Sequence, residues 1–225
     1  MDELFTLALA AIEKDFSLQP LPLPEGLDEI KYPFKIVHIQ CYNWKAEKIR
    51  KIYGMRVKIR LLALDILVLS IYPEVTFDVP IFYIDVACSR KTVFAYINCI
   101  ALFAEETYYR KYLDPLKPVH EKYVHFTPHT MSDWLQKYRN PCTVYTRPDK
   151  SFMGTIKDCS LDYLHAYLGI IAKAEKIKDE QYQIRIEQAH TSYIQDLITK
   201  DASRKILGRI IGMRRANQIF QQVLV

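Results

Sequence analysis

Two neighbouring apolar runs decide the fold: Asp65-Ile66-Leu67-Val68-Leu69-Ser70-Ile71-Tyr72-Pro73 and Pro80-Ile81-Phe82-Tyr83-Ile84-Asp85-Val86-Ala87. Both are rich in β-branched and aromatic residues and too short for typical buried helices, so they predict strands. Each run is apolar on both faces, which is typical of strands covered by other layers on both sides. The short link between them favours antiparallel order.

The rest of the chain extends this sheet and covers it. Strands are predicted over residues 34–42, 55–61, 64–72, 81–88 and 93–102. Helices are predicted over residues 2–16, 105–112, 160–177, 179–199 and 201–224, and alternating prolines make residues 18–24 an extended connector. We expect an α/β fold, a three-layer α/β/α sandwich with a central antiparallel sheet. It forms one domain, with a helix and connector over 1–33, the sheet core over 34–103 and a mostly helical part over 104–225.

Composition and charge exclude several classes of protein. Half of the 225 residues are hydrophobic and a quarter are charged, as in ordinary globular proteins. No apolar run reaches the roughly 20 residues of a membrane span, and the first residues lack the positive charge of a secretory signal. The net charge of +5 is small for a nucleic-acid-binding chain of this length. We therefore expect a cytoplasmic monomer that contacts neither membrane nor nucleic acid, or a plastid stromal protein whose presequence has been removed.

The motif search excludes most familiar enzymes. The five cysteines form no Cys-x-x-Cys pair, which favours reduced thiols and argues against a zinc site. The chain has no Gly-x-Gly-x-x-Gly, Walker A, Gly-x-Ser-x-Gly or His-Glu-x-x-His motif. His125 and His129 are four residues apart, but Pro128 argues against a helix that would present both to a metal. The sixteen tyrosines suit a pocket for a flat, partly polar ligand.

Two carboxyls stand out by their context. Asp85 lies inside an apolar strand, where a charged carboxylate needs either a partner or a bound proton. A carboxyl that binds a proton near neutral pH is suited to be a proton donor. From the residues alone, an ion pair with an Arg or Lys is the commoner explanation of such an Asp. Asp201 stands where a helix begins, and its spacing favours an N-cap.

A basic cluster occupies residues 45–60. Seven cations stand against Glu47 there, a sum of +6: Lys45, Lys48, Arg50, Lys51, Arg56, Lys58 and Arg60. Such a run is usually a solvated face. The last three alternate along the predicted strand, so they share one face, which could dock an acidic protein or anchor the carboxylates of a ligand.

Several stretches, in order, resemble the ferredoxin-dependent bilin reductase family. The two strands quoted first carry its core signature. Similar to other family segments are Asn140–Pro148, Asp162–Leu164 with Tyr167-Leu168, Lys200–Leu207, Ile211-Gly212 and Phe220–Leu224. The resemblance covers about residues 34–225 and implies the same α/β/α sandwich.

The resemblance implies reduction of biliverdin, a linear tetrapyrrole, to a phycobilin-type product by single electrons from reduced ferredoxin, a [2Fe-2S] protein. Family members bind no metal or flavin, so the enzyme positions the pigment and supplies protons. By this resemblance Asp85 and Asp201 are the catalytic acids and Arg147 pairs with a propionate. Arg56, Lys58, Val68 and Tyr83 are expected at the substrate. Because ferredoxin is acidic, four cations are candidates for its docking patch: Lys45, Lys48, Arg50 and Lys51.

Three departures from the family pattern bear on substrate and product. Val68 replaces a His found in members that make phycocyanobilin, which argues against that reaction. Tyr83 replaces a Gly and would narrow or reshape the pocket. Residues 99–102 lack the Asp and the Pro that usually end the next strand. Two alternatives therefore stay open: reduction of another open-chain tetrapyrrole, a chlorophyll catabolite, and a bilin-binding or carrier protein without catalysis.

Overall fold

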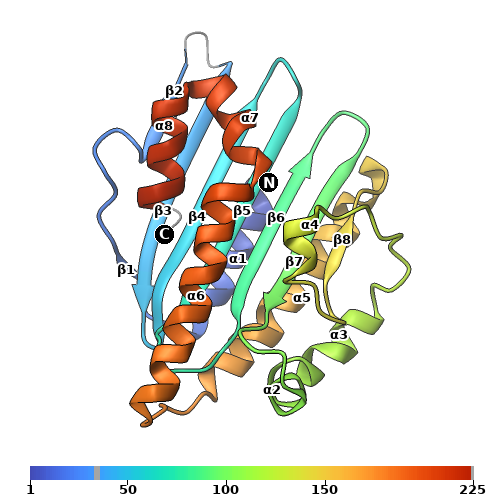
Figure 1. The fold of residues 1–225 in the computed structure, drawn as a ribbon. Helices are drawn as coiled ribbons and strands as arrows, with labels where there is room; N and C mark the ends of the chain where they lie inside the picture. Colours follow the sequence, from blue (N-terminus) through green and yellow to red (C-terminus); the bar gives the residue numbers. More distant parts are fainter. Residues whose placement is uncertain (33–35, 224–225) are drawn as a thin grey trace.

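A computed structural model describes residues 1–32 and 36–223. In it, an antiparallel sheet of eight strands runs in the order β1-β3-β4-β5-β6-β7-β8, and β2 also pairs with β3 (Figure 1). The strands are β1 Gln19–Pro20, β2 Glu29–Lys31, β3 Val37–Ala46, β4 Ile49–Ile59, β5 Leu64–Pro73, β6 Ile81–Cys88, β7 Val93–Ile100 and β8 Val144–Thr146. The five long strands are those that the apolar patterns predict.

The boundaries differ from the prediction where the pattern is weak. Strand β4 begins at Ile49 instead of Met55, because a register shift between Ile49 and Lys51 interrupts the alternation of its first residues. Strands β1, β2 and β8 have two or three residues each, too few to show a period. Phe34 and Leu224, expected to start a strand and to end a helix, lie outside the described residues.

Helices cover both faces of the sheet. In Figure 1, α6 (Glu180–Lys200), α7 (Ala202–Ile211) and α8 (Met213–Gln218) lie in front of it, and α1 (Asp2–Asp15) and α5 (Met153–Ala172) lie behind. The shorter helices are α2 Glu106–Tyr112, α3 Lys117–Glu121 and α4 Asp133–Gln136. This arrangement confirms the α/β/α sandwich. Among the described residues, no helix has the length and hydropathy needed to cross a bilayer.

The last helix is broken, which the sequence analysis did not predict. The continuous helix expected over residues 201–224 ends at Ile211, because Gly212 adopts a φ of 87°. The chain then continues as α8 and a π-turn over Ile219–Val223. A left-handed φ is favoured at glycine, so this residue type sets the break.

Alternation along β5 divides the core in two. Leu67, Leu69 and Ile71 face α1 and α5, and belong to one apolar cluster. Val68 and Tyr72 face α6–α8, and belong to the other. Val68 pairs with Asp85 of β6 across the ladder. Because paired residues of an antiparallel ladder point to the same face, Asp85 lies on the face covered by α6–α8.

The packing of α1 on β4 requires a residue without a Cβ at position 54, where the chain has Gly54. A Cβ added there would lie 2.9 Å from Cε2 of Phe5, on α1. We predict that Gly54→Ala lowers the free energy of unfolding by about 1–3 kcal/mol, because Phe5 must move out of its packed position. Urea unfolding checks this value.

Gly169 provides a matched control on the same side of the sheet. It is exposed in the last turn of α5, and an added Cβ would meet nothing within 4 Å. Gly169→Ala is expected to raise the free energy of unfolding by about 0.5–1 kcal/mol through helix propensity alone. Equal stability of Gly54→Ala and the wild type would contradict the tight packing of α1 on β4.

Candidate functional site

A cavity of about 200 Å³ lies between the sheet and the helices α6 and α7. Its lining is mostly apolar. From the strands come Met55, Val57, Ile59, Leu64, Ile66, Val68, Tyr83, Asp85 and Ala87, and from the C-terminal segments come Leu197, Asp201, Ser203, Ile206, Leu207, Ile210 and Phe220. Asp85 and Asp201 are the two acids among these residues, so two titratable groups meet in mostly apolar surroundings.

The two carboxyls reach the cavity from opposite layers. Asp85 comes from the middle of β6, and Asp201 from the junction between α6 and α7. Asp201 is also the N-cap of α7: its Oδ1 accepts hydrogen bonds from the backbone N–H of Ser203 at 2.7 Å and from the Ser203 hydroxyl at 2.6 Å. The capping role predicted for Asp201 is therefore compatible with a position in the cavity, because the cap fixes this carboxyl in place.

Burial changes the proton affinity of both acids. It raises the pKa of Asp85 to about 7, with a further contribution from the nearby Asp201 carboxyl. Burial also raises the pKa of Asp201, against the effect of the two hydrogen bonds from Ser203. Asp85 thus binds a proton over a range that extends to neutral pH, as a general acid requires.

Tyr83 and Val68 both line the cavity, where the sequence analysis placed them. The Tyr83 ring packs against Tyr96, with ring centroids 5.3 Å apart, and Tyr96 in turn contacts Tyr145 at 5.5 Å. Asp85 pairs with Tyr96 across the ladder between β6 and β7. An aromatic row therefore continues from the cavity across the sheet toward β8.

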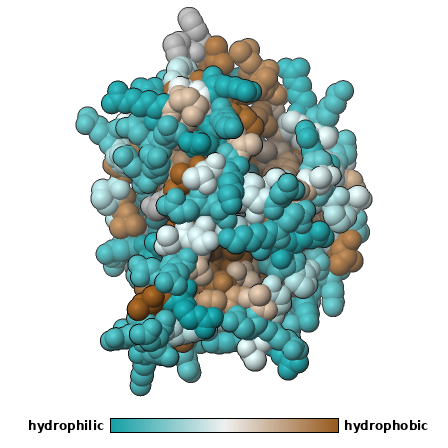
Figure 2. Space-filling model, viewed as in Figure 1, coloured by the Kyte–Doolittle hydropathy of each residue, from teal (hydrophilic) through white to brown (hydrophobic). Residues whose placement is uncertain are grey.

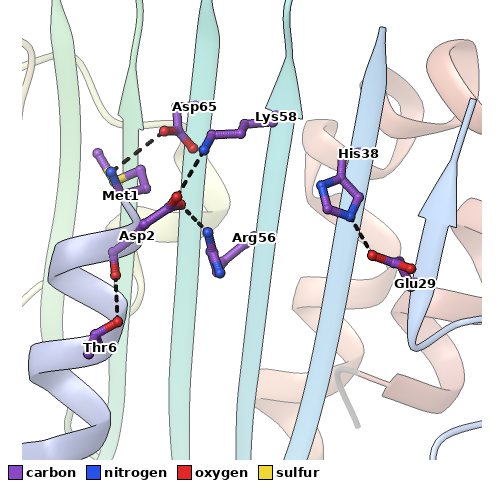
Figure 3. Close-up of polar contacts among 8 residues, drawn as sticks. All are labelled: Met1, Asp2, Thr6, Glu29, His38, Arg56, Lys58 and Asp65. Atoms are coloured by element: carbon purple, nitrogen blue, oxygen red, sulfur yellow. Dashed lines mark hydrogen bonds and ion pairs between the residues drawn. The ribbon is translucent and has the colours of Figure 1, made fainter. Parts of the chain in front are cut away.

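Arg56 and Lys58, which are expected at the substrate, do not line this cavity. They alternate with Met55, Val57 and Ile59 and point to the opposite face of the sheet. Figure 3 shows both beside the Asp2 carboxylate at the start of α1. Arg56 forms an ion pair with Asp2, and Lys58 Nζ lies 3.0 Å from Asp2 Oδ2. These cations attach α1 to the sheet.

The four cations expected at a docking patch lie near the turn between β3 and β4, away from Ile59 at the far end of β4. Lys48 Nζ donates hydrogen bonds to the carbonyls of Ala172 at 2.7 Å and Ala174 at 3.0 Å, at the end of α5. Arg50 packs over the ring of Tyr72, 5.4 Å from its centroid. Lys51 is buried and Lys45 is exposed. Much of this charge is used within the fold.

Arg147 is exposed, immediately after β8, and does not line the cavity of Asp85. Its Nε donates to the Thr92 hydroxyl at 3.4 Å, and it borders a separate hollow with His125, Phe126 and Phe152. The structure therefore does not bring Arg147 together with the two acids.

The sequence analysis missed the apolar lining that the C-terminal segments supply. Leu207, Ile210 and Phe220 fall within the helix predicted over residues 201–224, but the pattern alone does not say what they cover. The sequence also did not predict a larger hollow of about 500 Å³ beside the loop between α3 and β8. Its lining includes His120, His129 and Arg139. No group of three or more metal-ligating side chains occurs in the part of the chain that the structure describes.

Comparisons with known proteins agree on one family. Residues 6–225 match the family model described as ferredoxin-dependent bilin reductase. A phycoerythrobilin:ferredoxin oxidoreductase of Nostoc punctiforme is 25% identical, over 91% of this chain and 84% of the relative. A 15,16-dihydrobiliverdin:ferredoxin oxidoreductase of Gloeobacter violaceus is 24% identical, over 95% of this chain and 89% of the relative.

A solved structure has the same fold. The crystal structure of phytochromobilin synthase from tomato in complex with biliverdin superposes with a TM-score of 0.89 at 20% identity. The match covers 98% of this chain and 80% of that chain. The antiparallel sheet between two helical layers is thus an architecture already known from experiment.

The raised pKa of Asp85 gives a measurable pH dependence of stability. Because the ordinary value is 3.8 and the value in the folded chain is about 7, the native state binds more protons between these pH values. Stability must therefore fall as pH rises through this window. Asp85→Asn removes this dependence. Between about pH 4 and pH 8, the free energy of unfolding of the wild type should therefore fall by on the order of 3 kcal/mol relative to that of the variant.

Urea unfolding of both proteins across this range is the measurement. The comparison concerns the slope with pH, so a constant cost of the Asn side chain does not affect it. Parallel curves for the two proteins would show that Asp85 is an ordinary solvated carboxylate.

Proposed function

This chain belongs to the ferredoxin-dependent bilin reductase family, as its motifs predict, and on that basis we propose that it reduces biliverdin to a phycobilin-type linear tetrapyrrole. Reduced ferredoxin supplies the electrons one at a time. The observation that carries the proposal is the meeting of Asp85 and Asp201 in one apolar cavity. Among the described residues, the cavity lining has no polar side chain apart from these two acids and the hydroxyls of Tyr83 and Ser203, so these acids are the natural proton sources.

The reaction needs two protons for each double bond that is reduced. One C=C bond takes up two electrons from two reduced ferredoxins and two protons, and becomes a CH–CH single bond. A flat pigment between the sheet and α7 would present one face to Asp85 and the other to Asp201. Asp85, with its pKa of about 7, is the first candidate to donate a proton, because it carries one near neutral pH.

The pigment needs more room than the cavity offers. A volume of about 200 Å³ is below the roughly 300–1,000 Å³ of typical small-molecule sites. The cavity wall that can yield is α7, which follows the Asp201 junction and ends at the Gly212 break. Its Ile206 side chain is 56% exposed although it lines the cavity, so we expect α7 to move outward when the pigment binds.

Ferredoxin should dock where the pigment is close to the surface. Between residues 200 and 215, six cations stand against Asp201, a sum of +5 that equals the net charge of the chain: Lys200, Arg204, Lys205, Arg209, Arg214 and Arg215. Figure 2 shows hydrophobic residues near its upper edge, over the region where Figure 1 draws α7 and the hairpin between β4 and β5. Exposed there are Leu61, Leu62, Ile206 and Met213.

We therefore place the ferredoxin contact on α7 and α8 rather than on the cluster that begins at Lys45. A basic rim around an apolar patch fits a small acidic protein. This surface also borders the cavity, which keeps the path of the electron short. The cluster at Lys45 lies at the other end of β4, and Lys48 and Arg50 make contacts within the fold.

Exchange of each acid for its amide tests the chemistry. We predict that Asp85→Asn still binds biliverdin but turns it over about 10²–10⁴-fold more slowly, because the proton donor is lost. Asp201→Asn should also slow turnover, and since Asn is a good N-cap, this loss would not reflect a broken α7. The rate of turnover is measured as the loss of the biliverdin absorbance band. The reaction is followed anaerobically with ferredoxin and a ferredoxin-reducing system.

Asp65→Asn is the matched control. Asp65 is on the neighbouring strand β5 but faces α1, where its Oδ2 lies 3.5 Å from the amino terminus. It should keep the wild-type rate. Full activity of Asp85→Asn would refute the assignment. A wild type that binds biliverdin without reducing it would favour the carrier, and faster reduction of a chlorophyll-derived open-chain tetrapyrrole would favour the other alternative.

Charge reversal tests the docking surface. The double variant Lys205→Glu/Arg209→Glu should raise the KM for ferredoxin about tenfold at low salt, because it opposes an acidic partner. The difference from the wild type should shrink as salt is added. Lys45→Glu reverses an exposed cation of the other cluster and should leave the KM unchanged. If only Lys45→Glu raised the KM for ferredoxin, the contact with ferredoxin would lie at the turn between β3 and β4 instead.

A further inference from the structure

Below the cavity, a group of buried polar side chains lies between the sheet and α6. They belong to β4, β5 and α6. Several of their polar atoms have no hydrogen-bond partner among the described residues: the hydroxyls of Tyr53, Ser70, Tyr72 and Tyr193, Nε of Arg50 and Nε2 of His190. Buried polar atoms in native proteins are nearly always bonded to protein or to ordered water. This interior is therefore a place where protein hydroxyls and water form chains.

The strand register arranges this group as a ladder that leads away from Asp85. Residues that pair with one another across neighbouring strands form one row of the sheet. The row of Asp85 contains Val68, its partner on β5. One row further, Ser70 of β5 stands between Tyr83 of β6 and Tyr53 of β4. The row after that contains Tyr72. Successive rows are about 7 Å apart, a distance that one bridging water and a side-chain hydroxyl can span.

Neighbouring side chains of this ladder influence one another's pKa values. The carboxyl of Asp85 and the hydroxyls of Tyr193 and Tyr72 all help to raise the pKa of Tyr83, after burial. The Ser70 hydroxyl opposes the effect of burial on the pKa of Tyr72. These groups are therefore close to one another inside the protein, and Tyr83 connects them to the cavity that it lines.

The ladder reaches the surface near the start of β4. Arg50 lies over the Tyr72 ring, and its Nη2 is 3.5 Å from Nδ1 of His190. The exposed carboxylates of Glu74 and Glu187 oppose the lowering of the Arg50 pKa by burial, so they lie close to it. The ladder therefore ends beside two exposed carboxylates.

We propose that Tyr72, Ser70 and Tyr83, joined by ordered water, form a proton path from the surface at Arg50 and His190 to Asp85. The inference rests on the proposed function, because it explains how the donor is reloaded. When pigment fills the cavity beneath α7, Asp85 cannot recover its proton through the mouth. Each hydroxyl on the path gives one proton toward Asp85 and receives one from the next group. The sum is one proton from bulk water to the Asp85 carboxylate, with no change in oxidation state.

The test follows proton exchange at Asp85 without turnover. The complex with biliverdin is mixed into D₂O near pH 6, and the carboxylic C=O stretch is followed by infrared difference spectroscopy. Asp85→Asn identifies the band. Tyr72→Phe and Ser70→Ala should slow its shift at least about tenfold, because each breaks the path. Ser70→Thr, which keeps a hydroxyl, should restore the exchange.

Tyr108→Phe is the matched control. Tyr108 also has a buried hydroxyl without a hydrogen-bond partner among the described residues, but it lies in the cluster beneath α1 and α5. In Tyr108→Phe, the Asp85 carboxyl should exchange its proton at the wild-type rate. A wild-type exchange rate in Tyr72→Phe and Ser70→Ala would overturn the path. Slowing in Tyr108→Phe equal to that in Tyr72→Phe would also overturn it, because the cause would then be general loosening.

The failure of this path and the failure of the proposed function are separable. Reduction of biliverdin by the wild type with ferredoxin is measured in parallel. If the wild type binds the pigment but reduces nothing, the proposed function fails, while the exchange rates still decide whether the path exists. If the wild type reduces it and the variants exchange normally, the path fails alone.

Discussion

The burial of one carboxyl in an apolar sheet is the constraint on which the site depends. Asp85 stands in the middle of β6, opposite Val68, on the face that α6 and α7 cover. Water is too scarce there to stabilise its charge, so its pKa rises to about 7. The strand fixes where this proton is held, and Asp201 approaches it from the helical layer. A carboxyl that binds a proton near neutral pH thus follows from placing an acid among apolar side chains.

The two faces of the sheet use their charged residues in different ways. On the face of α1, Asp2 pairs with Arg56 and Lys58, and these contacts hold the first helix on β4. On the other face, the buried hydroxyls of Tyr53, Ser70 and Tyr72 have no hydrogen-bond partner among the described residues. The first face is thus stabilised by paired charges, and the second keeps groups that can exchange protons.

The apolar runs and the order of helices and strands were enough to predict the sandwich, and the one acid inside the Pro80–Ala87 run singled out Asp85. Alternation also put Arg56 and Lys58 on one face, but it could not tell which face holds the cavity. That depends on the pairing of Val68 with Asp85, a contact between strands that no local pattern contains. Charge counting has a similar limit, because it cannot show that Lys48 Nζ donates a hydrogen bond to the carbonyl of Ala172 at the end of α5. The break at Gly212 required a backbone angle that the helical stripe conceals.

A crystal structure of the complex with biliverdin would show whether Asp85 and Asp201 lie on the two faces of one pigment. We expect the pigment between the sheet and α7, with α7 displaced outward and one carboxyl against each face of the ring system. A pigment bound instead in the larger hollow beside His120 and His129, with Asp85 and Asp201 far from it, would contradict the account.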